Sequence, residues 1–264
     1  MKREPTKSGP MSPQAAILQH VSLLDGLKPE TRQRLEALAD LRTYPKGATV
    51  VAQGDGLAFV GLVIQGVLRV EKLLSDGRQQ IIALLTPTDM FGRVHAARSD
   101  YALEAATDVR LCCFERRGFE KLVSDHPDLE HAVLLSVLEE LDAAREWVVL
   151  LAGTRVAARL ANFLLILSRR WPKQHVTLNG DRNRLVITIP VDRTDLAHYL
   201  ATTVESISRS VQEFVRDGLI QPHNHATFEI LDLQGLIEVA GNDEFNSVEL
   251  IKEIKRMLAA QEMP

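Results

Sequence analysis

The segment Asp192–Gly218 constrains the fold more than any other part of the sequence. Asp192 is a preferred N-cap residue, and the apolar residues that follow it share one face of a short helix. Two threonines interrupt this pattern, and a second apolar series then recurs at intervals of three and four residues: Val204, Ile207, Val211, Phe214 and Val215. Gly218 ends the second helix as a C′ glycine. Two short helices joined by a tight turn, the second one amphipathic, are typical of a helix-turn-helix.

The beginning of the second helix carries polar side chains that suit base recognition. Glu205, Ser208 and Arg209 are separated by three and four residues and therefore share one face. Arginine can donate two hydrogen bonds to guanine, glutamate can accept one from cytosine, and serine can bond to bases or phosphates. We predict that these three residues, together with Thr203 and Ser206, bind DNA.

A structural interpretation of the same residues stays open. Thr202 and Glu205 fit the spacing of a capping box, in which the glutamate only satisfies the helix N-terminus. Arg209 and Glu213 have the spacing of an ordinary ion pair on a helix surface.

Composition favours an ordinary two-domain protein. The 264 residues suffice for two cores, and 45% hydrophobic and 25% charged residues are common values. No apolar run approaches the roughly 18 residues of a membrane span, and the polar start lacks the apolar segment of a secretory signal. Two adjacent cysteines cannot form a disulfide framework, which is typical of the reducing cytoplasm.

Charge is distributed unevenly along the chain. The net charge is −4, which does not indicate a nonspecific nucleic-acid binder. Residues 153–232 hold slightly more basic than acidic side chains, whereas residues 1–152 and residues 233–264 each hold more acidic than basic ones. A site-specific protein with few phosphate contacts tolerates such a balance.

The first half of the chain reads as a β-rich domain. A short amphipathic helix is predicted at Pro29–Leu41, and short β-type runs follow, with glycines at the turns between them. The runs are residues 48–52, 58–64, 67–74, 80–85 and 108–114. Many short strands at this spacing predict a small antiparallel barrel or jelly roll.

Pro127–Leu151 reads as one long helix. An apolar stripe with steps of four and three residues is interrupted by one arginine: Leu134, Leu138, Leu141, Arg145, Val148 and Ala152. A second stripe through Leu135, Trp147 and Leu151 indicates packing on the helix's own domain. A helix that is apolar on two sides and joins two domains favours a homodimer seam. Arg145 is costly there unless it pairs, for example with Glu140 or Asp142 of a second copy.

The last third of the sequence predicts a winged helix. A helix at Thr154–Trp171 follows a hinge at Gly153 and ends before Pro172, and residues 185–189 are strand-like. Residues 219–220 and 227–230 can pair around a turn that holds His223 and His225, forming a wing. A last amphipathic helix is expected from its apolar residues: Val248, Ile251, Ile254, Met257 and Leu258.

These features together resemble a known family. Glu205-Ser206-Ile207-Ser208-Arg209 resembles the recognition-helix signature of the Crp/Fnr transcription regulators, in the Fnr and FixK branch. The resemblance runs from about Leu24 to about Leu233, and its segments follow the family's order. The glycine turns resemble the β-roll of cyclic-nucleotide-binding domains in four places: Lys46-Gly47, Gln53-Gly54-Asp55, Gln65-Gly66 and Asp89-Met90-Phe91-Gly92.

The resemblance implies an α+β fold with a cyclic-nucleotide-binding-like β-roll (jelly roll), a dimerisation helix and a C-terminal winged helix-turn-helix. The expected segments are a flexible tail at 1–22, the sensor at 23–126, the helix at 127–152, the DNA-binding domain at 153–232 and an extension at 233–264. The implied function is a homodimeric activator that contacts RNA polymerase. Its expected operator is TTGAT, repeated inverted across a four-base gap, and its signal is related to redox state, oxygen or nitrogen oxides.

The expected nucleotide pocket departs from that of the cyclic-AMP receptors. Those proteins have a glutamate after Phe-x-Gly, where this chain has Arg93, and an Arg-Ser or Arg-Thr pair later in the loop. Arg98-Ser99 is the corresponding pair here, and it occurs too early. A carboxylate is needed for the ribose and an arginine for the phosphate. A cyclic-nucleotide or other small-molecule sensor therefore stays an alternative, not the first prediction.

The candidate effector or redox residues are Arg93, His95, Arg98, Cys112 and Cys113. An iron–sulfur cluster needs about four cysteines, and this chain has two, which as strand neighbours point to opposite faces. Their ordinary interpretation is one buried and one partly exposed thiol, and a redox-reactive cysteine is the alternative. Haem with His95 as a ligand is a further alternative; we predict no cofactor or metal. Since the sequence holds no catalytic motif, we expect no enzyme.

Overall fold

In the computed structural model, the described residues are 24, 26–77, 79–96, 98–152, 155–170, 176–179, 184–241 and 246–259. The chain divides into two compact units, which are described separately. The first comprises Met1–Val70 with Leu84–Leu141, and the second comprises Glu71–Ala83 with Asp142–Pro264. The predicted tail at 1–22, the hinge at Gly153 and the helix end at Pro172 lie outside the described residues.

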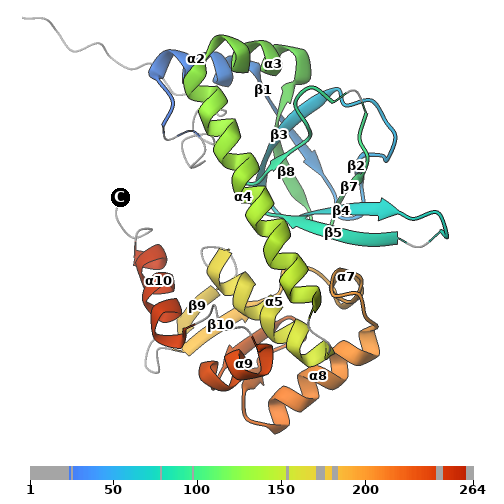
Figure 1. Ribbon diagram of the computed structural model, residues 1–264, viewed down its shortest axis with the longest axis vertical. Helices are drawn as coiled ribbons and strands as arrows, with labels where there is room; N and C mark the ends of the chain where they lie inside the picture. The colour runs from blue at the N-terminus through green and yellow to red at the C-terminus, as the bar shows by residue number, and fades with distance from the viewer. Residues whose placement is uncertain are drawn as a thin grey trace, which may run out of the picture. The chain divides into compact units, whose positions relative to one another are not determined.

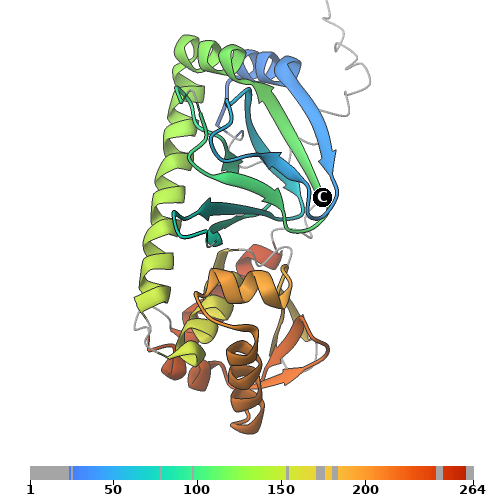
Figure 2. The ribbon, with the colours of Figure 1, turned by 90° about the vertical axis from the view of Figure 1, so that its right-hand side faces the viewer.

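Two antiparallel sheets form the predicted β-roll, and Figures 1 and 2 show their strands curling around a common interior. One sheet has the order β1-β8-β3-β6 and the other β2-β7-β4-β5. The strands are β1 Ala39–Tyr44, β2 Thr49–Val51, β3 Phe59–Gln65, β4 Leu68–Leu73, β5 Gln79–Leu85, β6 Met90–Phe91, β7 Ala102–Ala105 and β8 Val109–Glu115.

Strand β8 separates two apolar cores because its successive side chains point to opposite faces. Cys112 packs with Leu62 and neighbouring residues beneath helices α2 (Pro29–Leu38) and α3 (Arg116–Asp125). Cys113 faces the interior of the roll, where residues of both sheets meet: Val51, Leu57, Val63, Leu68, Phe91, Leu103, Ala105, Val109 and Leu111. The interior positions described there are therefore filled by apolar side chains.

Helix α4 (Pro127–Ala152) confirms the predicted long helix. Leu129 near its start and Leu150 near its end are buried, whereas Leu135 of the predicted packing stripe is 46% exposed. The prediction for Leu135 was wrong, because the helix turns a different face to its neighbours. The predicted seam is largely uncovered, with exposed apolar residues at Leu134, Leu138, Leu141 and Val148.

The second unit contains the predicted winged helix. Helices α5 (Val156–Arg170), α7 (Arg193–Tyr199) and α8 (Val204–Arg216) pack with a sheet of order β11-β12-β10-β9. The strands are β9 Val176–Asn179, β10 Arg184–Thr188, β11 Ile220–Pro222 and β12 Thr227–Ile230. The partly buried ring of Tyr199 lies 5.7 Å from that of Phe163 and 6.0 Å from that of Trp147, measured between centroids. These contacts attach the end of α4 to the helix-turn-helix.

The residues after the wing complete this unit's core. Helices α9 (Leu233–Ala240) and α10 (Ser247–Ala259) lie beside α5 (Figure 1). Asn162 of α5 donates through Nδ2 to the Ala240 carbonyl at 2.8 Å. The predicted last helix is present and Ile254 is buried as predicted, but Val248 is 58% exposed and Leu250 is buried in its place.

The structure corrects several other sequence predictions. The first helix ends at Leu38, not Leu41, because Leu41 pairs with Cys112 in the sheet. Val215 is 42% exposed and does not belong to the buried face of α8. Helices α3 and α9 and strands β6 and β7 were not predicted. Among the described residues, no helix combines the length and apolar character that a membrane span requires.

Candidate nucleic-acid interface

Asp192 begins the helix-turn-helix as predicted. Its carboxylate accepts hydrogen bonds from the backbone N–H groups of Thr194 and Asp195, both at 3.0 Å. These donors have no partner within the helix, so the carboxylate satisfies them and fixes the start of α7.

The turn between α7 and α8 has an unusual backbone. Ala201 adopts φ of 49°, a left-handed conformation that costs an L-residue about 1–2 kcal/mol. The Thr202 N–H bonds to the Ala197 carbonyl at 2.9 Å, which closes the turn. Arg159 of α5 donates through Nη1 to the carbonyls of Leu200 at 2.8 Å and Ala201 at 3.2 Å.

Thr203 caps α8. Its hydroxyl accepts the Ser206 N–H at 3.2 Å and also lies 3.2 Å from the Ser206 hydroxyl. The alternative capping box with Thr202 as the cap is therefore wrong: the cap is one residue later, and Glu205 is the second helical residue. A cap at Thr203 leaves the Glu205 side chain on the exposed first turn.

Glu205, Ser208 and Arg209 are exposed together on α8, while Ile207, Ser210 and Phe214 are buried on the other side. The predicted face is therefore available to a partner. An Arg209 Nη2 atom lies 3.1 Å from the Ser206 hydroxyl, and the Ser208 hydroxyl donates to the Val204 carbonyl at 3.0 Å. Such local bonds can be exchanged for bonds to a base or phosphate.

Glu213 does not pair with Arg209. Its carboxylate accepts from Arg155 Nη2 at 2.8 Å, and Arg155 lies immediately before α5. The alternative surface pair is thus wrong, and the Arg209 guanidinium stays on the Glu205 side of the helix.

Local hydrogen bonds keep Glu205 ionised. The pKa of its carboxyl is lowered, first by its own backbone N–H, then by the Thr203 hydroxyl and by the charge of Arg209. An ionised carboxylate is a hydrogen-bond acceptor only, which is the form that can accept from the amino group of cytosine.

Gln212 and Arg216 extend the same face and were not singled out from the sequence. Both are exposed. Gln212 lies three residues after Arg209, and Arg216 lies four residues after Gln212. The spacing of three and four residues that places Glu205 and Arg209 on one helix face also predicts Gln212 and Arg216 on that face.

The wing is joined to the first helix of the motif. Arg193 donates to the His225 carbonyl at 2.9 Å and lies over the Phe228 ring at 5.5 Å, and burial lowers its pKa. The His223 ring nitrogen Nε2 lies 3.2 Å from a Glu229 carboxylate oxygen. These contacts hold α7 and the wing together beside α8.

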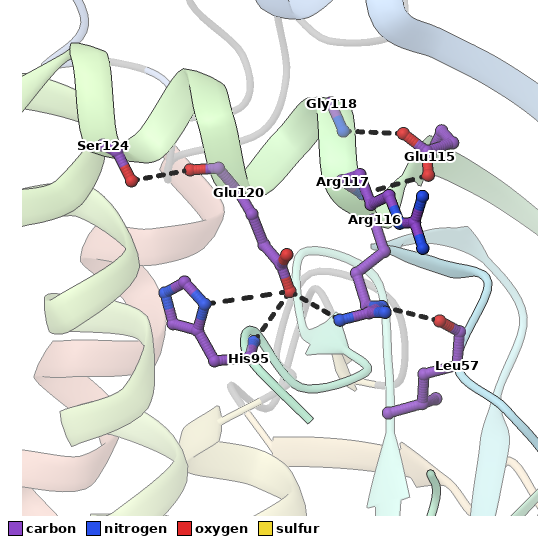
Figure 3. A network of polar contacts seen from close by, with 8 residues as sticks. All are labelled: Leu57, His95, Glu115, Arg116, Arg117, Gly118, Glu120 and Ser124. Carbon is purple, nitrogen blue, oxygen red and sulfur yellow. Dashed lines mark hydrogen bonds and ion pairs between the residues drawn. The ribbon is translucent and has the colours of Figure 1, made fainter. Parts of the chain in front are cut away.

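The candidate sensor residues do not form one cluster. The Arg93 guanidinium pairs with Asp100 at 3.1 Å, and both side chains are 63% exposed. The His95 N–H donates to Glu120 at 2.9 Å, as Figure 3 shows, while its ring is 73% exposed. Arg98 is exposed and forms a β-bridge with Gly56. No side chain with a nucleotide-binding role is identified by these contacts.

Figure 3 also shows what anchors the sensor loop. Glu120 of α3 accepts from the His95 backbone and, at 2.9 Å, from Arg116, which in turn donates to the Leu57 carbonyl at 2.8 Å. The pKa of Glu120 is lowered, with the His95 N–H as the largest favourable cause. The loop backbone is therefore tied to α3 through a carboxylate, at a residue whose φ of 63° is left-handed.

Both cysteines are buried, which corrects the expectation of one partly exposed thiol. Desolvation raises the pKa of Cys112 to about 12 and that of Cys113 to about 11. Neutral, inaccessible thiols are poor nucleophiles and poor metal ligands. Within the part of the chain that the structure describes, no group of three or more His, Cys, Asp or Glu residues could hold a metal ion.

Comparison with known proteins agrees with this architecture. A family model for the cyclic nucleotide-binding domain matches residues 41–126, and one for the Crp-like helix-turn-helix domain matches residues 158–239. The transcriptional activator protein FnrL of Cereibacter sphaeroides is 34% identical over 209 residues, which cover 79% of this chain and 84% of FnrL.

Two further relatives belong to the FixK group. The nitrogen fixation regulation protein FixK of Bradyrhizobium diazoefficiens is 30% identical over 67% of this chain and 72% of its own. The solved structure of FixK2 from Bradyrhizobium japonicum has a TM-score of 0.67 at 26% identity, covering 76% of this chain and 96% of that chain. The chain therefore belongs to the Crp/Fnr family of DNA-binding transcription regulators.

Proposed function

We propose that this protein is a homodimeric activator that binds the palindrome TTGAT-N4-ATCAA and responds to a redox, oxygen or nitrogen-oxide related signal. The exposed face of α8 carries this proposal, because Glu205, Ser208 and Arg209 are presented together at the start of the helix. This is the part of a recognition helix that meets base edges in the major groove. In this assignment Arg209 reads guanine, Glu205 accepts from cytosine, and Ser208 contacts a base or phosphate.

The apolar seam on α4 supports a homodimer. Leu134, Leu138, Leu141 and Val148 are each between 44% and 63% exposed, and they recur with heptad-like spacing along one helix. An uncovered apolar stripe of this kind is costly in water unless a partner covers it. A second copy of α4 offers the same stripe and matches it by symmetry.

Arg145 interrupts the seam, and its contacts differ from the prediction. Its Nη1 donates to Asp142 of its own helix at 2.9 Å, and both side chains are 68% exposed. The charge is thus already partnered within one chain. We infer that Arg145 and Asp142 enter the seam as a pair, which limits the cost of placing a cation between two copies.

The relatives support the output of the regulator. FnrL is a transcriptional activator, and FixK is a regulator of nitrogen fixation. Activation by contact with RNA polymerase is the corresponding output for this chain. The two thiols are buried in separate cores, so we place the entry of the signal at the exposed sensor loop with Arg93, His95 and Arg98, not at the cysteines.

Selection of bound sequences from random duplex DNA tests the proposal directly. Protein purified without oxygen and protein purified in air would be used in parallel, with sedimentation giving the oligomeric state of each. We expect an inverted repeat with TTGAT half-sites, a dimer in the bound state, and different yields under the two conditions. A monomer without preference for inverted repeats under either condition would contradict the proposal, and equal yields would remove the redox part alone.

A further inference from the structure

We propose that Arg159 is a positioning residue for DNA recognition, whose guanidinium holds the turn of the helix-turn-helix in the geometry that presents α8 to base pairs. Arg159 belongs to α5, a helix that carries none of the candidate DNA-reading residues. The inference rests on the family's DNA-binding role and does not depend on the proposed operator sequence.

The contacts of Arg159 are concentrated at one nitrogen. Nη1 donates to the Leu200 carbonyl at 2.8 Å and to the Ala201 carbonyl at 3.2 Å. The Nε atom is buried and has no hydrogen-bond partner among the described residues. A buried, unpaired N–H is unfavourable, and a methionine would fill the same space without it. The favourable contribution of this side chain therefore lies in the two charge-assisted bonds at its other end.

The two carbonyls lie where the turn most needs support. Leu200 is the C-cap of α7, which has only seven residues, and the last carbonyls of a helix have no partner within it. A cation is favourable at this end of a helix. Ala201 follows with its left-handed φ of 49°, which an L-residue adopts reluctantly. One guanidinium therefore satisfies the end of α7 and holds the strained residue that redirects the chain.

The direction of α8 depends on this turn. Only Thr202 separates Ala201 from Thr203, the residue that caps α8. A rotation of the backbone at Ala201 would therefore change the angle at which α8 leaves the turn. Glu205 and Arg209 would move with it, while the buried residues of α8 could still pack against α5. Loss of Arg159 should thus impair discrimination between sequences more than folding.

Arg155 is a matched control that lies immediately before α5. It is four residues before Arg159, carries the same charge and also contacts the motif, through Glu213 at 2.8 Å. Its side chain is 71% exposed, and it does not hold the turn. Exposed ion pairs of this kind contribute little, so removing Arg155 tests the loss of a nearby guanidinium without loss of the turn contact.

The experiment compares dissociation constants for two duplexes of equal length. One is a site recovered by selection with the wild-type protein, and the other is its scrambled sequence. Wild type, Arg159→Gln, Arg159→Lys and Arg155→Gln would be measured at one salt concentration. The active fraction of each would be determined by titration, and folding by circular dichroism and thermal melting.

We expect Arg159→Gln to lower the ratio of the two affinities at least about tenfold, with affinity for scrambled DNA within about threefold of wild type. Arg159→Lys should be intermediate, because an ammonium keeps the charge but lacks the rigid planar group in which the two Nη1–H bonds are directed at both carbonyls. Arg155→Gln should stay within about twofold of the wild-type ratio.

An unchanged ratio in Arg159→Gln, or an equal loss of affinity for both duplexes, would overturn the inference, since a residue that only stabilises the fold behaves in that way. If Arg159→Gln does not fold, the affinity ratio of the folded Arg159→Lys protein is the test. A wild-type ratio in Arg159→Lys would then overturn the inference. A wild-type protein that prefers no duplex would overturn the proposed function together with this inference.

Discussion

Arg209 lies on the exposed face of α8, where an Nη2 atom lies 3.1 Å from the Ser206 hydroxyl. Its neighbours explain why it is available: Glu213, the acidic residue at ion-pair spacing, is engaged by Arg155. The guanidinium is therefore held near Glu205 without being fixed in an ion pair with Glu213. At this scale, recognition depends on which local bonds can be exchanged for bonds to DNA.

Replacement of Arg209 by alanine should abolish operator preference but keep salt-sensitive binding to any duplex. The loss should correspond to about 1–3 kcal/mol of discrimination, because base contacts are lost while phosphate contacts are kept. Gel shifts with operator and scrambled DNA would measure it. Arg216→Ala, at the end of the same exposed face, is the control and should weaken both complexes alike. Undiminished discrimination by Arg209→Ala would remove Arg209 from the recognition surface.

The cysteines give a second prediction at the residue scale. Burial raises the pKa of Cys112 to about 12 and that of Cys113 to about 11. At alkaline pH below these values, both thiols therefore stay neutral in the folded protein, whereas the unfolded chain already ionises them. Their contribution to stability is complete below about pH 8.5 and is lost as the pH rises through the folded pKa values. The melting temperature should therefore fall above that pH.

Alkylation measures the same property at neutral pH. Iodoacetamide should modify the native thiols far more slowly than those of the denatured protein, because modification needs exposure and a thiolate. Rapid labelling of the native protein, comparable with that of the denatured control, would show that the thiols are accessible. Cys112 and Cys113 would then again be candidates for redox sensing.

Helices differ in how well their sequences predict them. α4 and α8 follow from apolar periodicity, because both are long enough to repeat the pattern several times. α3 was missed because its N-cap is Glu115, which is not among the preferred capping residues, although its carboxylate accepts the N–H groups of Arg117 and Gly118. A cap of this kind is recognised only when the hydrogen bonds are seen.

Side-chain roles that depend on distant parts of the chain could not be predicted. Val215 fits the apolar period of α8, yet it is 42% exposed. Arg159 contacts carbonyls 41 and 42 residues further along the chain, and no local pattern encodes such a contact. The reading residues themselves were predictable, since their spacing on one exposed helix face is a local property.

The apolar seam on α4 gives the prediction at the element scale. Replacement of Leu138, which is 47% exposed, by glutamate should place a charge in the seam and raise the dimer dissociation constant at least about tenfold. Leu135→Glu, a leucine of similar exposure that lies about 100° around the helix from Leu134, is the control. Analytical ultracentrifugation would measure both, and an unchanged dimer constant in Leu138→Glu would show that this stripe is not the seam.

Arg145→Leu tests the charged position in the same seam. Its removal leaves Asp142 without its partner in the helix, and an unpaired carboxylate at the seam opposes association, so we expect weaker dimerisation. Sedimentation of this variant beside the wild type would decide, and an unchanged constant would show that Arg145 does not regulate the monomer–dimer balance.

At the scale of the whole molecule, recognition by a dimer requires two separate surfaces of each chain. The α8 face offers one set of reading residues per chain, and the stripe on α4 offers a means of bringing two chains together. Two recognition helices of a dimer reach successive major grooves about one helical turn, ~34 Å, apart. Spacing between half-sites therefore becomes a property that the dimer must recognise.

Binding as a function of half-site spacing tests this claim most directly. Gel shifts would compare the palindrome with its four-base gap against the same half-sites separated by about five further base pairs, roughly half a helical turn. For a dimer with two recognition helices, we expect the insertion to place the half-sites on opposite faces of the duplex and to lower the affinity to that of a single half-site. Equal affinity for both spacings and for a lone half-site would contradict it, because the two reading surfaces would then act independently.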